Sequence, residues 1–308
     1  MAVAVGALAA GCSGGSDGGD VADVGALEPV AGGGGTQLRD VVNLAGVDPR
    51  DLDLAPGAGQ AVAVGAGPDG AVWLLVGGVS RSGTGIGPLA LEVAGDRVSP
   101  APTVEDAAPG AGVAVAGDGT VVLADGDQRE LVRYRDGEVA RVRPAGVAEV
   151  SLVAVGPDGT AYVADRSGGR VVAVAPDDGV ATVVDGAYAS ALSVGPDGTV
   201  HYVDQDTGAV RSVAPGGEPR TVSGQGSAEP ADGEPARGSS LNGTALAAAD
   251  DGLYVLSANE VWRIDGDGVL HLEVRRGEDA ALTALAAAGD RVYVFDEASG
   301  TLSLIGGR

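Results

Sequence analysis

The chain contains no lysine and very few cysteine or histidine residues. Its 308 residues include one cysteine, two histidines and 19 basic side chains, all of them arginine. A single cysteine excludes an intramolecular disulfide, so no disulfide framework holds the fold. A zinc site needs three or four converging His, Cys or carboxylate ligands, and no such spacing occurs here. We therefore expect neither a metal site nor a cofactor.

Basic side chains are also too few to balance the acidic ones. The 43 acidic residues give a net charge of −24 at pH 7. Nucleic-acid binding is disfavoured, because phosphate recognition requires a basic stripe and none is visible. An acidic surface of this kind keeps a protein soluble and monomeric, and we expect a monomer. A cationic partner is the alternative.

Long hydrophobic runs and helical periodicity are absent too. No segment is long enough to span a bilayer, and 54 glycines argue against long helices. Aromatic residues make up only 3% of the chain, whereas hydrophobic residues make up 44%. The core must therefore be packed mainly from valine, alanine and leucine.

A motif of strand, tight turn and strand recurs six times along the chain. The copies span residues 61–76, 112–125, 151–165, 191–204, 245–257 and 284–296. Most turns are built on Asp-Gly, in which glycine accepts the positive φ of a hairpin turn. Successive turns are 49, 40, 39, 54 and 38 residues apart. Periods near 40 with several short strands each indicate the blades of a β-propeller.

Two further strands follow each copy, except in the last repeat, which ends after its third strand. Residues 170–174 and 180–184 are the clearest such pair. A blade without its outer strand would leave unpaired backbone groups at an open edge. Residues 27–31 resemble the fourth strand at 220–224, so we expect them to complete the last blade. The sequence thus predicts an all-β, six-bladed propeller of four-stranded antiparallel blades, closed by an N-terminal strand.

One position in the second strand of each repeat carries mostly large, flat side chains. Its occupants are Trp73, Val122, Tyr162, His201, Tyr254 and Tyr293. Since they share one face of the strand, we expect them to pack between neighbouring blades. His201 is then a core histidine between blades. His271 falls in an outer strand, where we expect it to be exposed.

The N-terminus resembles the lipobox of bacterial lipoproteins. Leu8-Ala-Ala-Gly-Cys12-Ser13 precedes a flexible Gly/Ser/Asp linker, as a tether between membrane and domain should. In that family the chain is cut before the cysteine, which is then lipidated; this implies lipidation of Cys12. The preceding residues lack the charged start of a secretory signal, so we interpret 1–25 as a truncated signal, lipobox and linker. Residues 26–308 are the propeller domain. An incidental cysteine in a disordered N-terminus is the alternative.

The repeats resemble the NHL repeat. Val153-Ala-Val-Gly-Pro-Asp-Gly-Thr-Ala-Tyr-Val-Ala-Asp165, followed by Gly169-Arg170-Val171, carries the likeness. A second match is Val222-Ser-Gly-Gln-Gly226 with Ala231-Asp-Gly-Glu-Pro-Ala236, which looks like the long inter-blade loop of bacterial NHL propellers. The resemblance implies a six-bladed propeller that usually binds a partner. Some related propellers are lyases or lactonases with a metal or catalytic histidines over the central channel.

The second strand ends in aspartate in four of the six repeats, at Asp125, Asp165, Asp204 and Asp296. A residue repeated in each blade usually serves the blade, and such an aspartate can accept backbone N–H bonds in the following turn. The alternative is a ring of carboxylates at the channel mouth that attracts a cation. The acidic stretches 265–268 and 48–53 lack the ligand pattern of an EF-hand loop.

The longest connections are predicted to leave one face of the ring. Connections after second and fourth strands share a face, here called the loop face, and they include 32–60, 77–88 and 223–244. Arg166, Arg170, Asp206 and Glu297 lie on the same side. Together with the four aspartates they form the predicted ligand-binding face. Glycine-rich insertions that drift freely on a stable scaffold are the alternative.

These patterns favour an extracytoplasmic, lipid-anchored, non-enzymatic module that binds an envelope protein, a peptide or a glycan. The membrane is then a partner only through the lipid. A lyase or lactonase with a divalent cation held by the aspartates is the second hypothesis. A purely structural spacer in the envelope is the third.

Overall fold

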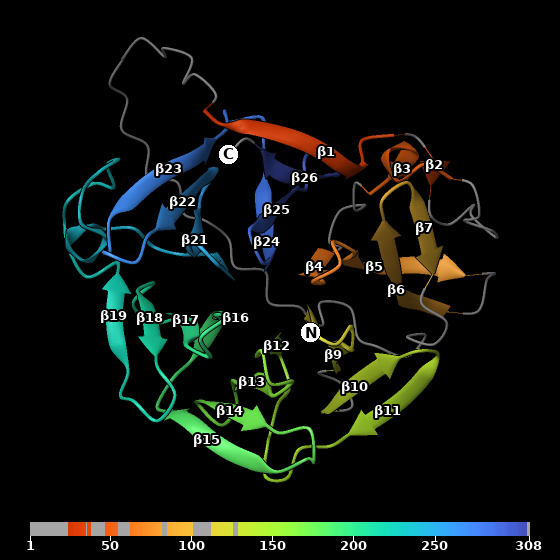
Figure 1. Ribbon diagram of the computed structural model, residues 1–308, viewed down its shortest axis with the longest axis horizontal. Helices are drawn as coiled ribbons and strands as arrows, with labels where there is room; N and C mark the ends of the chain where they lie inside the picture. The colour runs from red at the N-terminus through yellow and green to blue at the C-terminus, as the bar shows by residue number, and fades with distance from the viewer. Residues whose placement is uncertain are drawn as a thin grey trace.

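The computed structural model describes residues 24–34, 36–37, 47–54, 62–81, 85–100, 112–125 and 129–306. The predicted N-terminal segment 1–25, including Cys12, lies almost entirely outside them. The described residues form an all-β ring of six four-stranded antiparallel sheets (Figure 1). The fold class predicted from the repeats is therefore confirmed.

Each blade runs from an inner strand at the central channel to an outer strand at the rim. Blade one contains β4 (Val62–Ala66), β5 (Val72–Arg81), β6 (Gly85–Ala94) and β7 (Arg97–Pro100). Blade two contains β8 (Val113–Val115), β9 (Val121–Asp125), β10 (Glu130–Arg135) and β11 (Glu138–Val142). Blade three contains β12 (Leu152–Val155), β13 (Ala161–Asp165), β14 (Arg170–Val174) and β15 (Val180–Asp185).

The second half of the ring repeats the pattern. Blade four contains β16 (Ala189–Val194), β17 (Val200–Asp204), β18 (Val210–Val213) and β19 (Arg220–Ser223). Blade five contains β20 (Ala245–Ala249), β21 (Gly252–Ser257), β22 (Glu260–Ile264) and β23 (Leu270–Arg275). Blade six contains β24 (Leu282–Ala288), β25 (Arg291–Asp296) and β26 (Thr301–Gly306), with β1 (Ala26–Gly32) as its outer strand.

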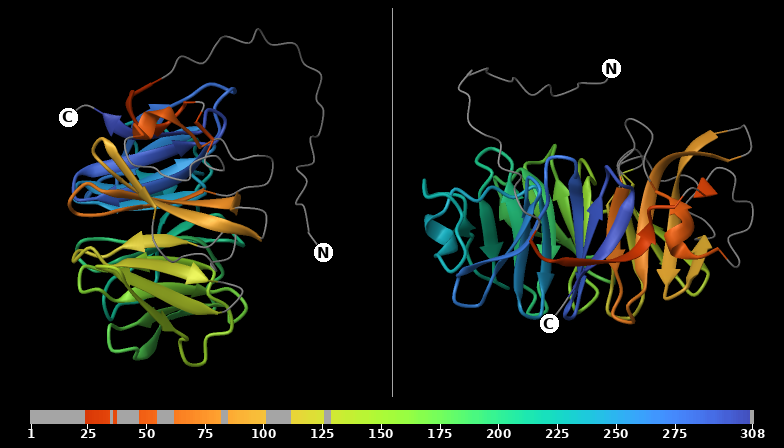
Figure 2. Two further views of the ribbon diagram at one scale, coloured as in Figure 1. Left: turned by 90° about the vertical axis from the view of Figure 1, so that its right-hand side faces the viewer. Right: turned by 90° about the horizontal axis from the view of Figure 1, so that it is seen from above.

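The N-terminal strand closes the ring as the strand count predicts. β1 pairs antiparallel with β26, from Ala26 opposite Gly306 to Gly32 opposite Thr301. Just before β1, Val24 also pairs with Arg275 at the end of blade five. Arg276 donates hydrogen bonds to the carbonyl oxygens of Val24 and Gly25, at 2.8 and 3.0 Å. The segment thus links the last two blades (Figure 2).

The Asp-Gly turns are formed locally. Asp158 accepts hydrogen bonds from the backbone N–H and the hydroxyl of Thr160, at 3.0 and 2.9 Å. Gly159 follows with a φ of +80°, which residues with a Cβ rarely adopt. Asp197 and Thr199 repeat the arrangement in blade four. The contacts that shape the turn thus lie within Asp-Gly-Thr itself, which is why the repeats can be recognised from the sequence.

The core is divided among the six interfaces between blades. Five of the six residues at the shared second-strand position join these clusters: Trp73, Val122, Tyr162, Tyr254 and Tyr293. Trp73, for example, packs with Val113 and Val121 of blade two, and Tyr293 packs with Val64 of blade one. The predicted packing between blades is confirmed at these positions. The remaining residues of these clusters are mostly aliphatic.

The long segments differ from the sequence prediction. Residues 77–88 are not a loop: β5 and β6 extend through most of them as a hairpin that projects beyond the ring (Figure 2). Residues 223–244 do not project from the loop face but fold along the outer edge of blade five. There Gly233 N–H donates to Leu270 O at 2.8 Å and Ala236 N–H to Gly268 O at 2.9 Å. That segment is anchored and does not drift.

Segment 32–60 is described only in part. Its η2 (Pro49–Asp51) is followed by β3 (Leu52–Asp53), which pairs in parallel with β2 (Thr36–Gln37). Leu52 and Leu54 are buried in the cluster between blades six and one. This part therefore packs on the rim of the ring. A 3-10 turn in the 223–244 segment, η3 (Ala236–Gly238), makes a similar contact at blade five.

Candidate functional site

The central channel offers little chemistry. Three consecutive residues from each inner strand line a cavity of about 100 Å³, namely 64–66, 113–115, 153–155, 192–194, 246–248 and 285–287. All are aliphatic or glycine except Ser193, whose Oγ accepts the Ala248 N–H at 2.9 Å. The serine is thus used in a hydrogen bond between blades four and five. No side chain lining this cavity is a general acid, a base or a metal ligand.

The aspartates that end the second strands are turned into their own loops. Asp204 accepts the N–H of Asp206 at 3.1 Å, and Asp296 accepts the N–H groups of Ala281 and Ala298 at 2.8 and 3.1 Å. Asp125 is completely buried. The carboxylates of Asp204 and Asp296 thus hold loops together. Among the described residues, no group of three or more His, Cys, Asp or Glu side chains could hold a metal ion.

Asp165 is the most strongly held of the four. Its buried carboxylate accepts the N–H groups of Glu149 and Gly168, both at 3.0 Å, and the Arg170 Nε at 3.0 Å. Burial by itself would raise the pKa of Asp165, but the bonds from Arg170 and the backbone outweigh it and keep the pKa below its usual range. Arg170 is engaged by this ion pair, so these two predicted site residues serve the scaffold.

The two histidines have different surroundings. His201 is partly buried opposite Ser193 and Ser212, and its Nδ1 is buried without a hydrogen-bond partner among the described residues. Burial lowers the pKa of His201 from 6.5 to about 4, so the ring is neutral at pH 7. His271 is half-buried, with Nε2 at 2.8 Å from Asp265 Oδ2. It is less exposed than the sequence suggested.

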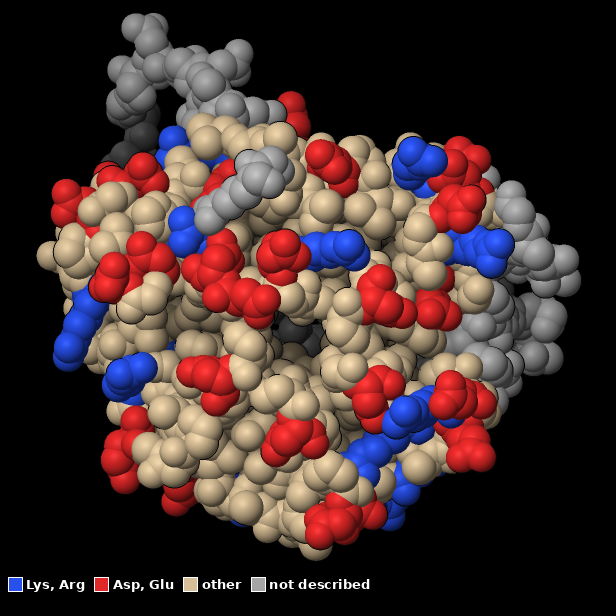
Figure 3. All heavy atoms as spheres, viewed as in Figure 1, with Lys and Arg blue, Asp and Glu red and all other residues tan. Residues whose placement is uncertain are grey.

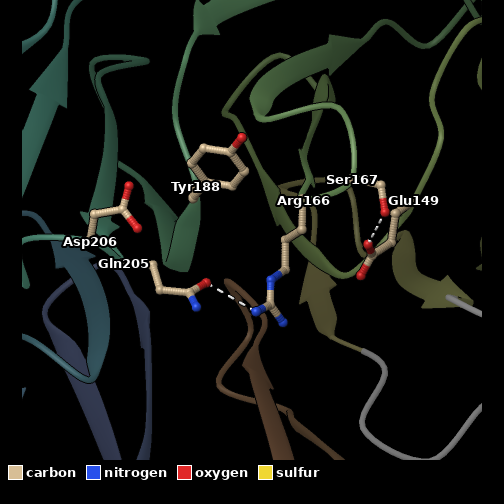
Figure 4. Close-up of a pocket in the computed structure, with 6 residues that line it drawn as sticks. All are labelled: Glu149, Arg166, Ser167, Tyr188, Gln205 and Asp206. Atoms are coloured by element: carbon tan, nitrogen blue, oxygen red, sulfur yellow. Dashed lines mark hydrogen bonds between the residues drawn. The ribbon is translucent and has the colours of Figure 1, made fainter.

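A polar groove on the loop face brings side chains of two blades together. Its volume is about 440 Å³, within the ~300–1,000 Å³ range typical of ligand sites. Six residues line it, here called the groove residues: Glu149, Arg166, Ser167, Tyr188, Gln205 and Asp206. They come from the connections that precede β12 and β16 and that follow β13 and β17. Figure 4 shows Arg166 between the Gln205 side chain and the Glu149–Ser167 pair.

Tyr188 is the aromatic side chain of the groove. It is 47% exposed and is one of only two exposed large hydrophobic residues in the described part of the chain. A Cβ at Gly169 would lie 3.1 Å from the Tyr188 ring, so glycine there lets the ring rest on the backbone. The Tyr188 carbonyl also accepts the Gln205 N–H at 2.8 Å. The ring is therefore held in place and still open to solvent.

The polar groove residues carry both donors and acceptors. Arg166 Nη2 donates to Gln205 Oε1 at 3.0 Å, and Ser167 Oγ donates to Glu149 Oε2 at 2.6 Å. These pairs align the side chains but use only part of their hydrogen-bonding capacity. Asp206 is exposed at the edge. One guanidinium and two carboxylates give the groove a net charge near −1.

Of the predicted binding-face residues, only Arg166 and Asp206 line this groove. The others lie outside it: Asp125, Asp165, Arg170, Asp204, Asp296 and Glu297. The Glu297 N–H donates to Ala281 O at 2.8 Å. Sequence reasoning missed Glu149, Ser167, Tyr188 and Gln205. Tyr188 left one usable signal: it is an aromatic residue outside the packing position in a chain that has few aromatics.

Acidic side chains outnumber basic ones on the face shown in Figure 3, and several surround the hollow at its centre. The face opposite the loop face carries the Asp-Gly turns and is here called the turn face. Aspartate carboxylates there largely accept hydrogen bonds from the backbone of their own turns. Asp69 accepts the Ala71 N–H at 3.1 Å and Asp118 the Thr120 N–H at 3.0 Å. No helix in the described part of the chain is long and apolar enough to cross a membrane.

No family model and no curated protein matches this chain, so the resemblance to NHL repeats stays a prediction. Solved structures do match it as a propeller fold. It is similar to virginiamycin B lyase from Staphylococcus aureus, solved as an inactive His-to-Ala variant with quinupristin, at 12% identity and a TM-score of 0.55. That alignment covers 82% of this chain and 83% of the lyase.

Two further solved structures share the propeller fold but carry other functional names. A gluconolactonase from Xanthomonas campestris is 18% identical with a TM-score of 0.55, and the alignment covers 80% of this chain and 86% of that chain. An auxiliary nutrient binding protein from Bacteroides ovatus is 13% identical with a TM-score of 0.57, covering 77% and 66%. At such identities the likeness concerns the fold alone.

Proposed function

We propose that this protein is a non-enzymatic binding or sensing module that works outside the cytoplasm, tethered by a lipid on Cys12. Its partner is an envelope protein, a peptide or a glycan, engaged through the loop face. The observation that carries the proposal is the groove, in which a held but exposed tyrosine meets polar side chains from two blades. A neighbour of the same fold is named as a nutrient-binding protein.

The second hypothesis, a lyase or lactonase, gains nothing from the geometry. It depends on the second-strand aspartates meeting at one cation, at ~2.3–2.6 Å from each oxygen. Asp165, Asp204 and Asp296 instead accept backbone N–H groups of the loops on either side of their blade's first two strands. The channel cavity is lined by aliphatic side chains and one serine. Among the described residues, neither feature brings a base to a nucleophile or gathers three ligands around a metal ion.

The tether can be tested by intact mass and detergent partitioning of the natively expressed protein. We expect a diacyl- or triacylglyceryl mass and partitioning into the detergent phase, both lost in Cys12→Ala. An unmodified wild-type protein that stays soluble in the cytoplasm would contradict the proposed envelope location.

Binding can be tested by sedimentation with washed cell-envelope particles from the source bacterium. The protein that carries only Cys12→Ala, and so has no lipid, should sediment with the particles. The same protein with Arg166→Ala and Tyr188→Ala added should stay in solution. Arg135→Ala is the matched control, because Arg135 is an exposed arginine paired with Asp118, distant from the groove residues. Failure of every protein to sediment would contradict the proposal and favour a structural spacer. Equal sedimentation of all of them would contradict binding through the groove.

A further inference from the structure

We infer that the groove binds a neutral glycan, with a sugar ring stacked on Tyr188. This inference rests on the proposed function and narrows its partner to one chemical class. It starts from the six groove residues, which combine hydrogen-bonding capacity with an exposed aromatic ring.

The aromatic ring is the first argument. Most aromatic side chains described in the structure are buried between blades, whereas Tyr188 is 47% exposed. The hydroxyl end of its ring lies against Gly169, which is buried and has a φ of +62°. A side chain at that position would push the tyrosine away. The exposed part of the ring therefore offers a flat apolar surface that is already in place before a ligand arrives.

The charge pattern is the second argument. Glu149 and Asp206 would repel a phosphate or sulfate, so the single Arg166 does not make an anion site. A groove with a net charge near −1 gives a cation only a weak, salt-screened attraction. A neutral ligand meets no repulsion from Glu149 or Asp206 and needs no charged partner. The charge pattern therefore excludes anions and is compatible with a neutral ligand.

The balance of donors and acceptors is the third argument. Carboxylate oxygens accept hydrogen bonds, the guanidinium donates them, and the amide of Gln205 does both. Each hydroxyl of a sugar is also a donor and an acceptor, whereas the C–H groups of its ring form an apolar face. Arg166 and Gln205 are aligned by their own bond at 3.0 Å, which reduces the cost of ordering them around a ligand.

The shape of the groove fits a segment of a longer chain. The groove runs from the Glu149–Ser167 pair past Arg166 to Gln205 and Asp206 (Figure 4). It is shallow and open on the loop face, so a polymer can lie across it and continue on both sides. A volume of about 440 Å³ accommodates a short oligosaccharide segment.

The test uses envelope particles that have been treated chemically before the sedimentation experiment. One portion is digested with protease and washed, and another is oxidised with periodate, which cleaves the vicinal diols of sugar rings. We expect binding of the Cys12→Ala protein to survive protease and to be lost after periodate. Loss after protease with survival after periodate would overturn the glycan assignment while leaving a binding module intact. No binding to untreated particles would instead overturn the proposed function itself.

Point variants then assign the ring. Tyr188→Ala should weaken binding to protease-treated particles about tenfold, whereas Tyr188→Phe keeps the platform and should bind as the wild type does. Val139→Ala serves as the control, because Val139 is the other large hydrophobic side chain found exposed among the described residues and lies on the outer strand β11. Equal binding by Tyr188→Ala and the wild type would overturn the stacking role, as would binding that weakens steeply with added salt.

Discussion

At the scale of single residues, two aspartates on the loop face have opposite roles. Asp165 is fully buried and bonded to Arg170 and to backbone N–H groups, whereas Asp206 is exposed at the groove. Asp165→Asn removes the charge from a buried ion pair, so we expect the free energy of unfolding to fall by roughly 3 kcal/mol. Urea unfolding followed by circular dichroism measures this loss.

Asp206→Asn is the matched control for that substitution. It changes the same chemical group on the same face, and we expect its unfolding free energy to stay within about 0.5 kcal/mol of the wild type. Equal losses in the two variants would show that Asp165 has no special structural role. Envelope binding should weaken more in Asp206→Asn than in Asp165→Asn, since only Asp206 lines the groove.

His201 makes the fold sensitive to acid. Its pKa is about 4 in the folded protein against 6.5 for the free side chain, because burial disfavours the charged ring. Between these values His201 binds more protons in the unfolded chain than in the folded one. Its contribution to the free energy of unfolding is therefore fully present above pH 6.5 and is lost as the pH drops towards 4. The shift corresponds to a loss of about 3 kcal/mol.

His201→Tyr should remove this part of the pH dependence, because Tyr162, Tyr254 and Tyr293 occupy the equivalent position in other blades. The measurement is the urea midpoint at several pH values between 7 and 4 for both proteins. His271→Gln removes the other histidine and should keep the wild-type loss. If the His201→Tyr and wild-type curves stay parallel over this range, His201 is not the acid-sensitive group.

At the scale of elements, ring closure depends on β1. Deleting residues 1–32 would leave blade six with three strands and expose the unpaired edge of β26. We expect a loss of unfolding free energy on the order of 5 kcal/mol, from the missing ladder and its buried contacts, together with self-association. Sedimentation velocity and urea unfolding report the two effects.

A synthetic peptide of residues 24–33 provides the control for the deletion. It carries β1 and the Val24 and Gly25 carbonyls that Arg276 contacts, so it can add to the edge as a strand. We expect it to restore the monomer, whereas a peptide of the same composition in scrambled order should not. A truncated protein that is monomeric and fully stable alone would contradict closure by β1.

The elements that could be predicted from the sequence are those that local chemistry specifies. Asp158, Gly159 and Thr160 form their turn by themselves, so repeated Asp-Gly-Thr sequences reveal the blades. The closing strand also followed, because a missing fourth strand demands a partner. The path of 223–244 did not, since it depends on distant contacts such as Ala236 N–H to Gly268 O. Glycine-rich 77–88 looked like a loop although strand pairing extends through most of it.

The groove was only partly predictable for a similar reason. Arg166 and Asp206 follow second strands and share the repeat pattern, so they were placed on the correct face. Tyr188 lies in the connection between blades three and four, where no repeat signal exists. Its neighbour Gln205 is 17 positions away in sequence and is brought there by the backbone bond to Tyr188 O. Contacts between blades cannot be inferred from a repeat, because each repeat encodes only its own blade.

At the scale of the whole molecule, the dominant quantity is the net charge of −24. Folding concentrates this charge, so mutual repulsion destabilises the compact ring. Added salt also weakens ion pairs such as Arg133–Asp178, but 43 acidic residues face only 19 arginines, so repulsion dominates. Since the Debye length falls from ~30 Å at 0.01 M to ~3 Å at 1 M salt, we expect sodium chloride to stabilise the fold by about 1–2 kcal/mol.

The same titration separates general screening from a specific cation site. Screening depends on ionic strength alone, so choline chloride should raise the urea midpoint as much as sodium chloride does. Calcium chloride at 1 mM contributes almost no ionic strength, and we expect it to leave the midpoint unchanged, because Asp204 and Asp296 already accept backbone N–H groups. A rise with calcium that choline does not reproduce would mean that carboxylates converge on an ion after all. The lyase or lactonase hypothesis would then regain its premise, and the groove would no longer be the leading site.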